Sequence, residues 1–371
     1  MLFISLVVVT TLTILLIQKV NSTCDPTLTD SAGSLISCCP SAAGGVIITD
    51  GVTSIPASAF YLCIALTSIT IPSSVVTIGA SAFQGCTKLP SIILPSSVTV
   101  ISDYLLYGCS LLSSVTMQGA VTSIGVNSFI NCVVLASISI PSTVTTIGIG
   151  AFYGCKKITS IIIPSGVTVI SDSLLNGCTT LTSVTIQGAV TSIGANSFKQ
   201  CQISSITIPN TVMTIGDYAF FFCPALTSVT IPDSVTTIGS YVFQGCSALT
   251  SVTIPNSVTS IGTNCFRACL KLPSITLPSS ITVISDYMFY GCSVLSSVTV
   301  QGAVTSIGAN SFYNCIALAS ITIPNTVTTI GTSAFYSCPL TSVTIPASVI
   351  TIGTSVFQGV VVLLLSQSLI A

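Results

Sequence analysis

Histidine, tryptophan and glutamate are absent from this chain of 371 residues, and only 4% of its residues are charged. Soluble domains usually carry roughly 25% charged residues. Without histidine the chain has no Ser-His-Asp or Cys-His catalytic group, no imidazole base and no histidine-containing metal site. We therefore expect no enzyme activity, no catalytic residues, no metal site, no cofactor and no small-molecule substrate.

The few charges that are present nearly cancel, with a formal net charge of −1. Serine and threonine take the place of the missing charged residues, so the surface is expected to be polar but almost neutral. A basic patch is the usual electrostatic sign of a protein that binds nucleic acid or an acidic membrane surface. The composition offers no such patch, and we expect no nucleic acid partner.

What the chain does have is a cysteine in every repeat of a regular array. Successive cysteines of this series are 23 residues apart, except for one interval of 22. The series is Cys63, Cys86, Cys109, Cys132, Cys155, Cys178, Cys201, Cys223, Cys246, Cys269, Cys292, Cys315 and Cys338. A period of this size is typical of tandem arrays, in which each short unit stacks on the next. The length therefore indicates one elongated domain.

Each repeat predicts the same local structure. Isoleucine stands eight residues before the cysteine position in all fourteen copies, and phenylalanine or leucine stands three before it. In one copy, Ile69–Ile71 alternates as a strand and Pro72 ends it, while Ala80–Gly85 is long enough for one helical turn. Stacked copies predict a curved parallel β-sheet solenoid of about 14 repeats, with short helical turns on its other face.

The full repeat reads Leu-x-x-Ile/Val-x-Ile-Pro-x-x-Val-x-x-Ile-Gly-x-x-x-Phe-x-x-Cys. This run resembles the BspA-type (Treponema pallidum-type) leucine-rich repeat, and the resemblance covers residues 46–360. The resemblance implies a secreted or cell-surface protein that adheres to host proteins or to other cells. It supplies no catalytic residues.

A longer period lies over the shorter one. Residues 87–155, 156–223 and 270–338 are three copies of a three-repeat block. In each block a glutamine replaces the usual proline, and these glutamines are Gln118, Gln187 and Gln301. The blocks indicate duplication of a three-repeat segment. A more specific hypothesis is that they recreate one binding feature at intervals along the rod.

The cysteines are expected to be buried thiols, because free cysteine packs as a small hydrophobic residue. Disulfides between neighbouring repeats and metal binding are the alternatives. Three further cysteines, Cys24, Cys38 and Cys39, precede the repeats. In a secreted protein, a Cys24–Cys38 or Cys24–Cys39 disulfide could close an N-terminal cap.

Two rows of hydroxyl groups are predicted to face outward from the strands, and they form the candidate binding face. The solubility and strand propensity of threonine account for such rows without any ligand. The functional interpretation is a surface that adheres to protein or glycan through many hydrogen bonds. The residues are Ser68, Thr70, Ser114, Thr116, Ser183, Thr185, Ser228, Thr230, Ser251, Thr253, Ser297, Thr299, Ser320 and Thr322.

The chain is divided into four segments: residues 1–22, 23–45, 46–360 and 361–371. The first is apolar and too short for a standard membrane span, so it is interpreted as a cleaved secretory signal, or else as an uncleaved anchor. The others are a cap region, the repeat solenoid and a short apolar tail. We expect a secreted or cell-surface protein that binds a protein or glycan of another cell or matrix. The alternatives are a structural solenoid that binds a lattice such as ice or chitin, and a membrane-anchored cytoplasmic interaction scaffold.

Overall fold

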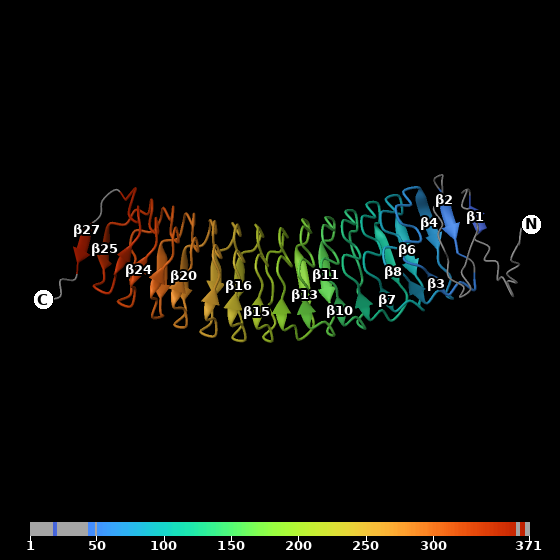
Figure 1. Cartoon of the computed structure of the whole chain (residues 1–371), viewed down its shortest axis with the longest axis horizontal. Coiled ribbons are helices and arrows are strands. Elements are labelled where there is room, and N and C mark those ends of the chain that lie inside the picture. Colours follow the sequence, from blue (N-terminus) through green and yellow to red (C-terminus); the bar gives the residue numbers. More distant parts are fainter. Residues whose placement is uncertain (1–17, 21–43, 49, 361–363, 368–371) are drawn as a thin grey trace, which may run out of the picture.

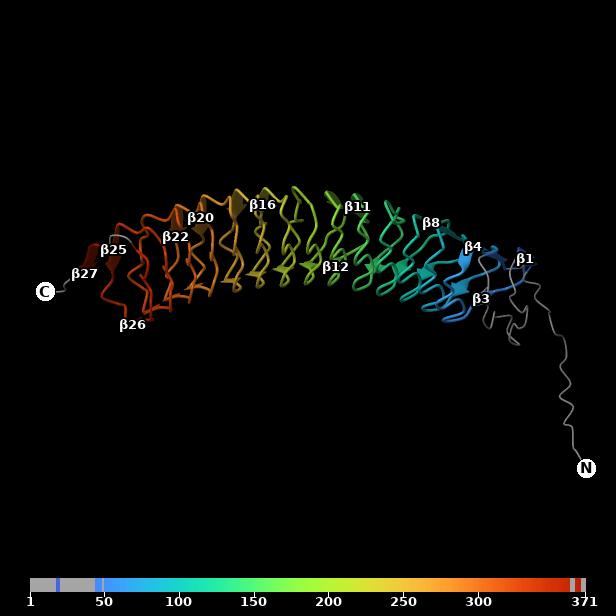
Figure 2. The same ribbon diagram turned by 90° about the horizontal axis from the view of Figure 1, so that it is seen from above.

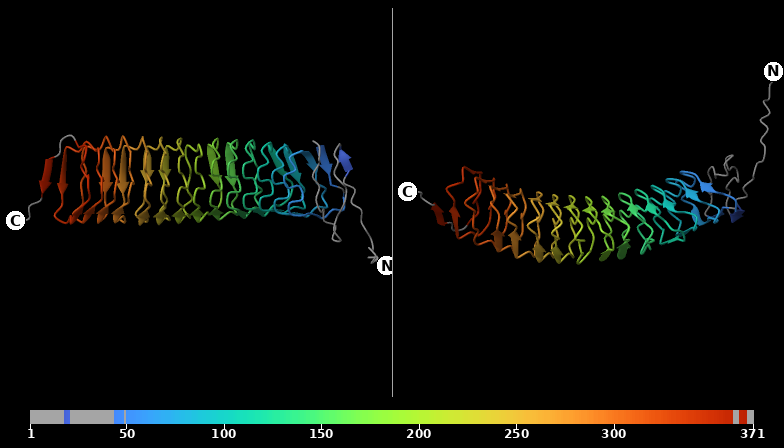
Figure 3. Two further views of the ribbon diagram at one scale, coloured as in Figure 1. Left: turned by 45° about the horizontal axis from the view of Figure 1, so that its top comes forward. Right: turned by 90° about the horizontal axis from the view of Figure 1, so that it is seen from below.

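The computed structural model describes residues 18–20, 44–48, 50–360 and 364–367. The chain winds about 13 times around a long axis as a parallel β-solenoid, and the turns lie side by side from one end of the rod to the other (Figure 1). Seen from above, the rod is a gentle arc (Figure 2). Two further views show the same single layer of turns along the whole rod (Figure 3). The expected repeat solenoid is confirmed.

Each turn contributes to two strand faces, and the longer strands form the first of them. All except β4, which begins at Leu66, start at the serine that follows the cysteine by four or five residues, and these strands carry most of the candidate hydroxyl groups. These strands are β4 (Leu66–Thr70), β6 (Ser91–Leu94), β8 (Ser114–Met117), β11 (Ser160–Ile163), β13 (Ser183–Ile186), β16 (Ser228–Thr230), β18 (Ser251–Thr253), β20 (Ser274–Leu277), β22 (Ser297–Val300) and β25 (Ser342–Ile345).

The second face is made of strands of two residues, each ending at the isoleucine that all the repeats share. They are β3 (Ser54–Ile55), β5 (Thr77–Ile78), β7 (Val100–Ile101), β9 (Ser123–Ile124), β10 (Thr146–Ile147), β12 (Val169–Ile170), β14 (Ser192–Ile193), β15 (Thr214–Ile215), β17 (Thr237–Ile238), β19 (Ser260–Ile261), β21 (Val283–Ile284), β23 (Ser306–Ile307), β24 (Thr329–Ile330) and β26 (Thr351–Ile352). Pairing is parallel and in register, so that Ile238 faces Ile261.

Three more strands lie at the ends of the rod. Strand β1 (Gln18–Val20) pairs antiparallel with β2 (Gly44–Ile47), and β2 pairs in parallel with β4. At the other end, β27 (Leu364–Gln367) pairs in parallel with β25. The described part of the tail therefore adds one more strand to the first face. The segment boundaries given above stay predictions.

The two faces differ in how continuously their strands pair. The short strands form sheets of up to five members, such as β12-β14-β15-β17-β19. The long strands pair two at a time, for example β16 with β18 and β20 with β22, and no ladder joins β18 to β20. In Figure 2 the labelled long strands β8, β11 and β16 lie along the outer edge of the arc, and β12 lies nearer its inner edge. Curvature spreads the turns on the outer side, which explains the gaps between pairs.

The core consists of ladders of like residues that run along the axis. The shared isoleucine is buried in every copy except the last, where Ile352 is half exposed. The phenylalanine rings stack on those of adjacent turns, with centroids 5.6 Å apart between Phe243 and both Phe220 and Phe266. Leu106 and Leu175 fill the two positions where a ring is missing, and both are fully buried. A single unit cannot bury this surface alone, so each turn depends on its neighbours.

The third side of each turn corrects the sequence-based prediction, because it contains no helical turn in the described residues. The segment Ala80–Gly85 folds instead as consecutive tight turns, with Ser81 at φ 57° and Gly85 at φ 75°. These two left-handed residues break a right-handed helical path. The N–H groups of Ser81, Phe83 and Gly85 then donate to carbonyls of the following turn at 2.7–3.0 Å. The backbone therefore joins repeats to one another, whereas a helix would bond within one repeat.

The aspartates of this side serve the same purpose. The Oδ1 of Asp103 accepts from the N–H of Val126 in the following repeat, at 2.7 Å. Asp172, Asp217 and Asp286 do likewise at 2.7–2.8 Å. Each carboxylate thus satisfies a backbone donor across the junction between two turns.

Glycine after the shared isoleucine is favoured by close approach of the preceding turn. A Cβ at Gly262 would lie 2.4 Å from the backbone nitrogen of Ser240, well inside van der Waals contact. Serine occupies this position in three repeats, and there its hydroxyl donates to a carbonyl of the preceding turn, as Ser285 does to Ile261 at 2.6 Å. The position thus admits serine through one added hydrogen bond.

We expect Gly262→Val to lower the free energy of unfolding by about 3 kcal/mol, because the branched side chain collides with backbone that cannot move independently. Gly262→Ser is the matched control, since its hydroxyl can donate to the carbonyl of Ile238 as its counterparts do. Urea unfolding monitored by circular dichroism measures both. Equal stability of the two variants would contradict the close-approach explanation.

Candidate binding surface

The candidate hydroxyl groups lie where the strand pattern placed them. All fourteen of the predicted serines and threonines are exposed. Twelve are on long strands, from Ser68 and Thr70 on β4 to Ser297 and Thr299 on β22, while Ser320 and Thr322 lie in a stretch without an assigned strand. The rows therefore run along the outer side of the arc and are longer than any single ligand pocket.

These hydroxyl groups differ from those at the strand starts because they are not used internally. At the start of the short strands, the hydroxyl of Thr122 donates to the carbonyl of Thr99 at 3.2 Å. At the start of the long strands, Thr250 donates to Thr227 at 3.0 Å. Within the described residues, the fourteen candidate hydroxyls make no such bond. Their hydrogen-bonding capacity is open to solvent or to a ligand.

The threonine row is interrupted at two places. Ile93 and Ile162 occupy the row position in β6 and β11, and each is 53% exposed. They give two apolar points in an otherwise hydroxylated row. The face is therefore not a uniform lattice of one side chain.

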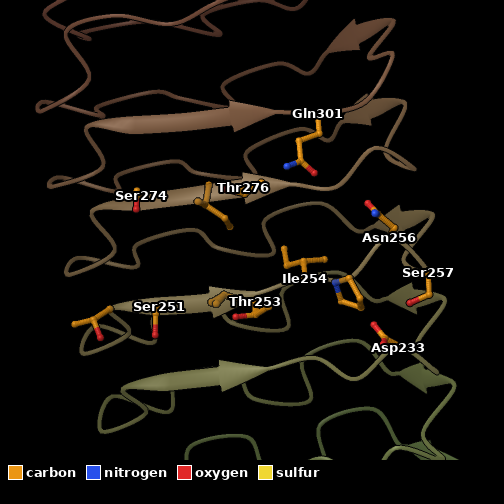
Figure 4. A pocket seen from close by; sticks show the side chains of 13 residues that line it. Asp233, Ser251, Thr253, Ile254, Asn256, Ser257, Ser274, Thr276 and Gln301 are labelled. Atoms are coloured by element: carbon orange, nitrogen blue, oxygen red, sulfur yellow. The ribbon is translucent and has the colours of Figure 1, made fainter.

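A groove opens where two long strands fail to pair. It lies between β18 and β20 and has a volume of about 670 Å³. Figure 4 shows Ser251 and Thr253 on one strand, Ser274 and Thr276 on the next, and Gln301 reaching in from the following repeat. Its remaining lining is Asp233, Thr250, Val252, Ile254, Pro255, Asn256, Ser257 and Ile275. One carboxylate lines this groove, and neither lysine nor arginine does.

A proline contributes to this opening. Along the first face, the N–H at the start of a long strand donates to the preceding repeat, as Thr250 does to the carbonyl of Thr227 at 2.8 Å. The residue at this position before β20 is Pro273, which has no N–H to donate to Thr250. The next repeat recovers the bond, since Ser296 donates to Pro273 at 2.9 Å. Strands β18 and β20 therefore separate at their first residues.

The cysteine ladder makes a hydrogen bond that the sequence did not predict. From Cys86 to Cys338 the repeat thiol donates to the carbonyl of the phenylalanine or leucine position one repeat earlier, as Cys109 does to Phe83 with 3.1 Å between Sγ and O. Burial raises the pKa of Cys86 to about 12, and that of Cys132 equally. These thiols stay protonated at neutral pH, so they cannot act as nucleophiles.

The expectation of buried free thiols is confirmed from Cys86 to Cys338. It is wrong for Cys63, which is buried but forms a disulfide whose second cysteine lies outside the described residues. Cys24, Cys38 and Cys39, the candidates for a cap disulfide, also lie outside them. In the part of the chain that the structure describes, no three cysteine or aspartate residues gather as a metal site would require.

A row of aromatic side chains lies on the tight-turn side and was not predicted from the sequence. Tyr290, Tyr313 and Tyr336 stack with centroids 4.8 and 4.5 Å apart. The guanidinium of Arg267 lies 4.6 Å from the Tyr290 ring centre. Their common position two residues before the cysteine is the signal that could have revealed them. Stacking covers the ring faces and leaves the edges partly exposed, so this row contributes mainly to cohesion between turns.

Comparison with known proteins agrees with the repeat geometry. The family model described as the BspA type leucine-rich repeat region, of six copies, matches residues 53–181, 170–296 and 236–363. No curated protein sequence matches the chain significantly. No helix among the described residues is long and apolar enough to cross a membrane.

Three solved structures share the fold over most of their length. A leucine-rich repeat protein from Bacteroides ovatus is 29% identical, with a TM-score of 0.69, over 93% of this chain and 91% of that one. A leucine-rich cell surface protein from Faecalibacterium prausnitzii is 26% identical, with a TM-score of 0.54, over 92% of both chains. A leucine-rich repeat protein from Eubacterium ventriosum is 24% identical, with a TM-score of 0.58, over 88% of this chain and 91% of that one, and shows the fold alone.

Proposed function

Because this chain belongs to the BspA-type leucine-rich repeat family, we propose that it is a non-catalytic adhesion protein of the cell surface or the secreted fraction. Proteins with these repeats are generally non-catalytic binding proteins, typically of the cell surface. In this proposal the ligand is a protein or glycan of another cell or matrix, and it binds along the outer rows of serine and threonine.

The observation that carries the proposal is that some hydroxyl groups bond to the backbone of a neighbouring turn, whereas, in the part of the chain that the structure describes, those of the outward rows do not. Those at strand starts, such as Thr122 and Thr250, donate to the preceding turn. Those in the outward rows make no bond within the described residues. A hydroxyl that holds the fold together is unavailable to a ligand, whereas an open one can both donate and accept. Many weak contacts spread along a rod suit adhesion through multivalency.

Localisation is part of the same proposal. The Faecalibacterium prausnitzii protein, similar over 92% of both chains, is described as a cell surface protein. Residues 1–22, the proposed secretory signal, lie mostly outside the described residues. A lattice-binding role is less favoured, because Ile93 and Ile162 interrupt the threonine row and the long strands pair unevenly.

We expect Thr70→Lys, Thr116→Lys and Thr185→Lys together to reduce adhesion of the purified protein to immobilised host matrix and to glycan-coated surfaces at least about tenfold, because long charged side chains block the row. The matched control places lysine at Thr146, Thr214 and Thr237, which are exposed on short strands. Surface plasmon resonance compares both with the unchanged chain. Adhesion that survives the first set, or falls equally in both, would exclude the long-strand face.

A further inference from the structure

The groove beside Gln301 has a register-matched copy elsewhere in the rod. A second groove of about 460 Å³ is lined by Ser137–Ile140, Ser142, Ser160–Ile162, Pro164 and Gln187. Gln187 and Gln301 are the same position of the duplicated three-repeat block. In both grooves two neighbouring repeats supply the walls and the third supplies the glutamine. The two differ at four wall positions, where Val252, Thr253, Asn256 and Thr276 in the first groove correspond to Ile138, Ser139, Ser142 and Ile162 in the second.

The first groove contains a buried hydroxyl without a partner. Ser257 lines the groove, and its Oγ is inaccessible to solvent and makes no hydrogen bond within the described residues. Its counterparts in other repeats are satisfied: Ser234 donates to the carbonyl of Val212 at 2.6 Å, and Thr326 donates to Val304 at 2.6 Å. A buried polar atom left unpaired is costly, and a ligand or an ordered water would relieve that cost once the side chain turns its Oγ into the groove.

The groove supplies donors and acceptors of mixed kind. The Asn256 side-chain oxygen accepts from the backbone N–H and the hydroxyl of Ser279 at 3.0–3.1 Å. The Asn256 amide N–H groups are not used in these bonds. Strands β18 and β20 share no ladder, so the backbone groups between them also lack a strand partner. With the hydroxyls of Thr253 and Thr276, the groove offers alternating donors and acceptors over a short distance.

Charge limits the class of ligand. Asp233 is the one ionisable side chain of the groove, and no cation lines it. A sulfated or acidic ligand would meet a negative charge with nothing to neutralise it. A ligand with many hydroxyl groups, each both donor and acceptor, matches an amide, a carboxylate and several hydroxyls without any charge. Its volume is within the range of about 300–1,000 Å³ that small-ligand sites occupy.

We propose that the groove beside Gln301, and more weakly its copy beside Gln187, each bind a short segment of an uncharged oligosaccharide. The inference rests on the proposed function, since it names the ligand class for part of the same face. Gln301 and Asn256 form hydrogen bonds to the sugar with their side-chain amides, and the hydroxyls of Ser251, Thr253 and Thr276 contact it from the strands. Two grooves at the same position of the duplicated block allow a single polysaccharide strand to be held at two points.

The test is isothermal titration calorimetry of the full chain with cellohexaose and with maltohexaose. Gln301→Leu is expected to weaken binding of the preferred sugar about tenfold, because it removes a donor and an acceptor from the groove. Gln187→Leu is expected to have a smaller effect, and the double variant to abolish binding. Gln84→Leu is the matched control, because Gln84 lies on the tight-turn side between the left-handed residues Ser81 and Gly85. Thermal unfolding confirms that each variant is folded.

Unchanged affinity in Gln301→Leu, or an equal loss in Gln84→Leu, would overturn the inference. So would an unchanged chain that binds neither neutral sugar, or that prefers a heparin hexasaccharide to both. The chain could instead bind a protein ligand, lose that binding in the lysine variant and bind no sugar. That result would overturn this inference and leave the proposed function intact. If adhesion and sugar binding were both lost only in the control with lysine at Thr146, Thr214 and Thr237, the inference and the proposed function would both be overturned.

Discussion

Raising the pH from about 8 to about 11 is expected to unfold the array cooperatively, with the free, buried thiols from Cys86 to Cys292 as the main cause. Burial in the apolar core raises the pKa of these groups, to about 12 for Cys178, Cys246 and Cys292, from an ordinary value of 9.0. The unfolded chain can ionise its thiols from about pH 9 upward, but the folded chain cannot.

The sign of the effect follows from which state binds the proton more tightly. A folded-state pKa above the unfolded value gives stability that is complete below about pH 9 and is lost as the pH rises towards 12. One pH unit above the unfolded pKa, each such thiol costs the folded state about 1.4 kcal/mol relative to the unfolded one. The free energy of unfolding of a domain is only about 5–15 kcal/mol. The summed cost of keeping the ladder of thiols protonated therefore exceeds the stability of the fold.

Circular dichroism during an alkaline titration measures the transition, and iodoacetamide labelling reports when the thiols become accessible. The control variant carries valine at Cys155, Cys178 and Cys201, following the natural Val360 at the corresponding position. Its unfolding midpoint should move to higher pH. A midpoint that stays in place would assign the alkaline transition to tyrosine ionisation. Thiols that react at pH 8 in the native chain would contradict the buried ladder itself.

Much of the fold could be predicted because equivalent positions can be compared among the fourteen repeats of one chain. The position of Ile238 is isoleucine in every copy, and such uniformity indicates a site where one shape fits against the copies before and after it. The structure places Ile238 opposite Ile261 and buries both. The alternation of serine and threonine with apolar residues in β18 likewise predicted which side chains would be exposed.

The tight-turn side could not be predicted in the same way. A segment such as Ala80–Gly85 has the length and small residues of a single helical turn, and length was the only criterion available. What excludes a helix is the direction of the N–H groups: those of Ser81 and Phe83 donate to the next repeat. Left-handed φ at Asn127, Asn196 and Asn310 agrees with the tolerance of asparagine for this region, but Tyr218 and Tyr241 give no such sign.

The grooves depend on curvature, which no single repeat encodes. Gln301 was notable in the sequence only because it replaced a proline. Its nearness to Thr253 and Thr276 arises because β18 and β20 separate on the outer side of the arc. Pro273 could have been recognised as a residue unable to donate to Thr250. How far the strands would separate follows from the accumulated bend of the rod.

Replacing Phe243 with alanine is expected to lower the free energy of unfolding by about 3–5 kcal/mol. The ring is fully buried and stacks between Phe220 and Phe266, with 5.6 Å between ring centres on each side. Its removal leaves a cavity that neither neighbour can fill, because each is held by its own turn and by the stack beyond it. Phe243→Leu is the matched control, since Leu106 and Leu175 fill this position naturally and are fully buried.

In a linear array the loss also changes how the molecule unfolds. Each turn contacts only its neighbours, so stability is a sum of unit and interface terms, and a weak interface in the middle uncouples the two halves. Phe243→Ala is therefore expected to give two transitions in urea, and faster amide hydrogen exchange in the adjoining turns than at either end of the rod. Phe243→Leu should keep one transition, with a loss of about 1 kcal/mol. A single, equally cooperative transition in the alanine variant would mean that the array is held together by its backbone hydrogen bonds more than by the aromatic stack.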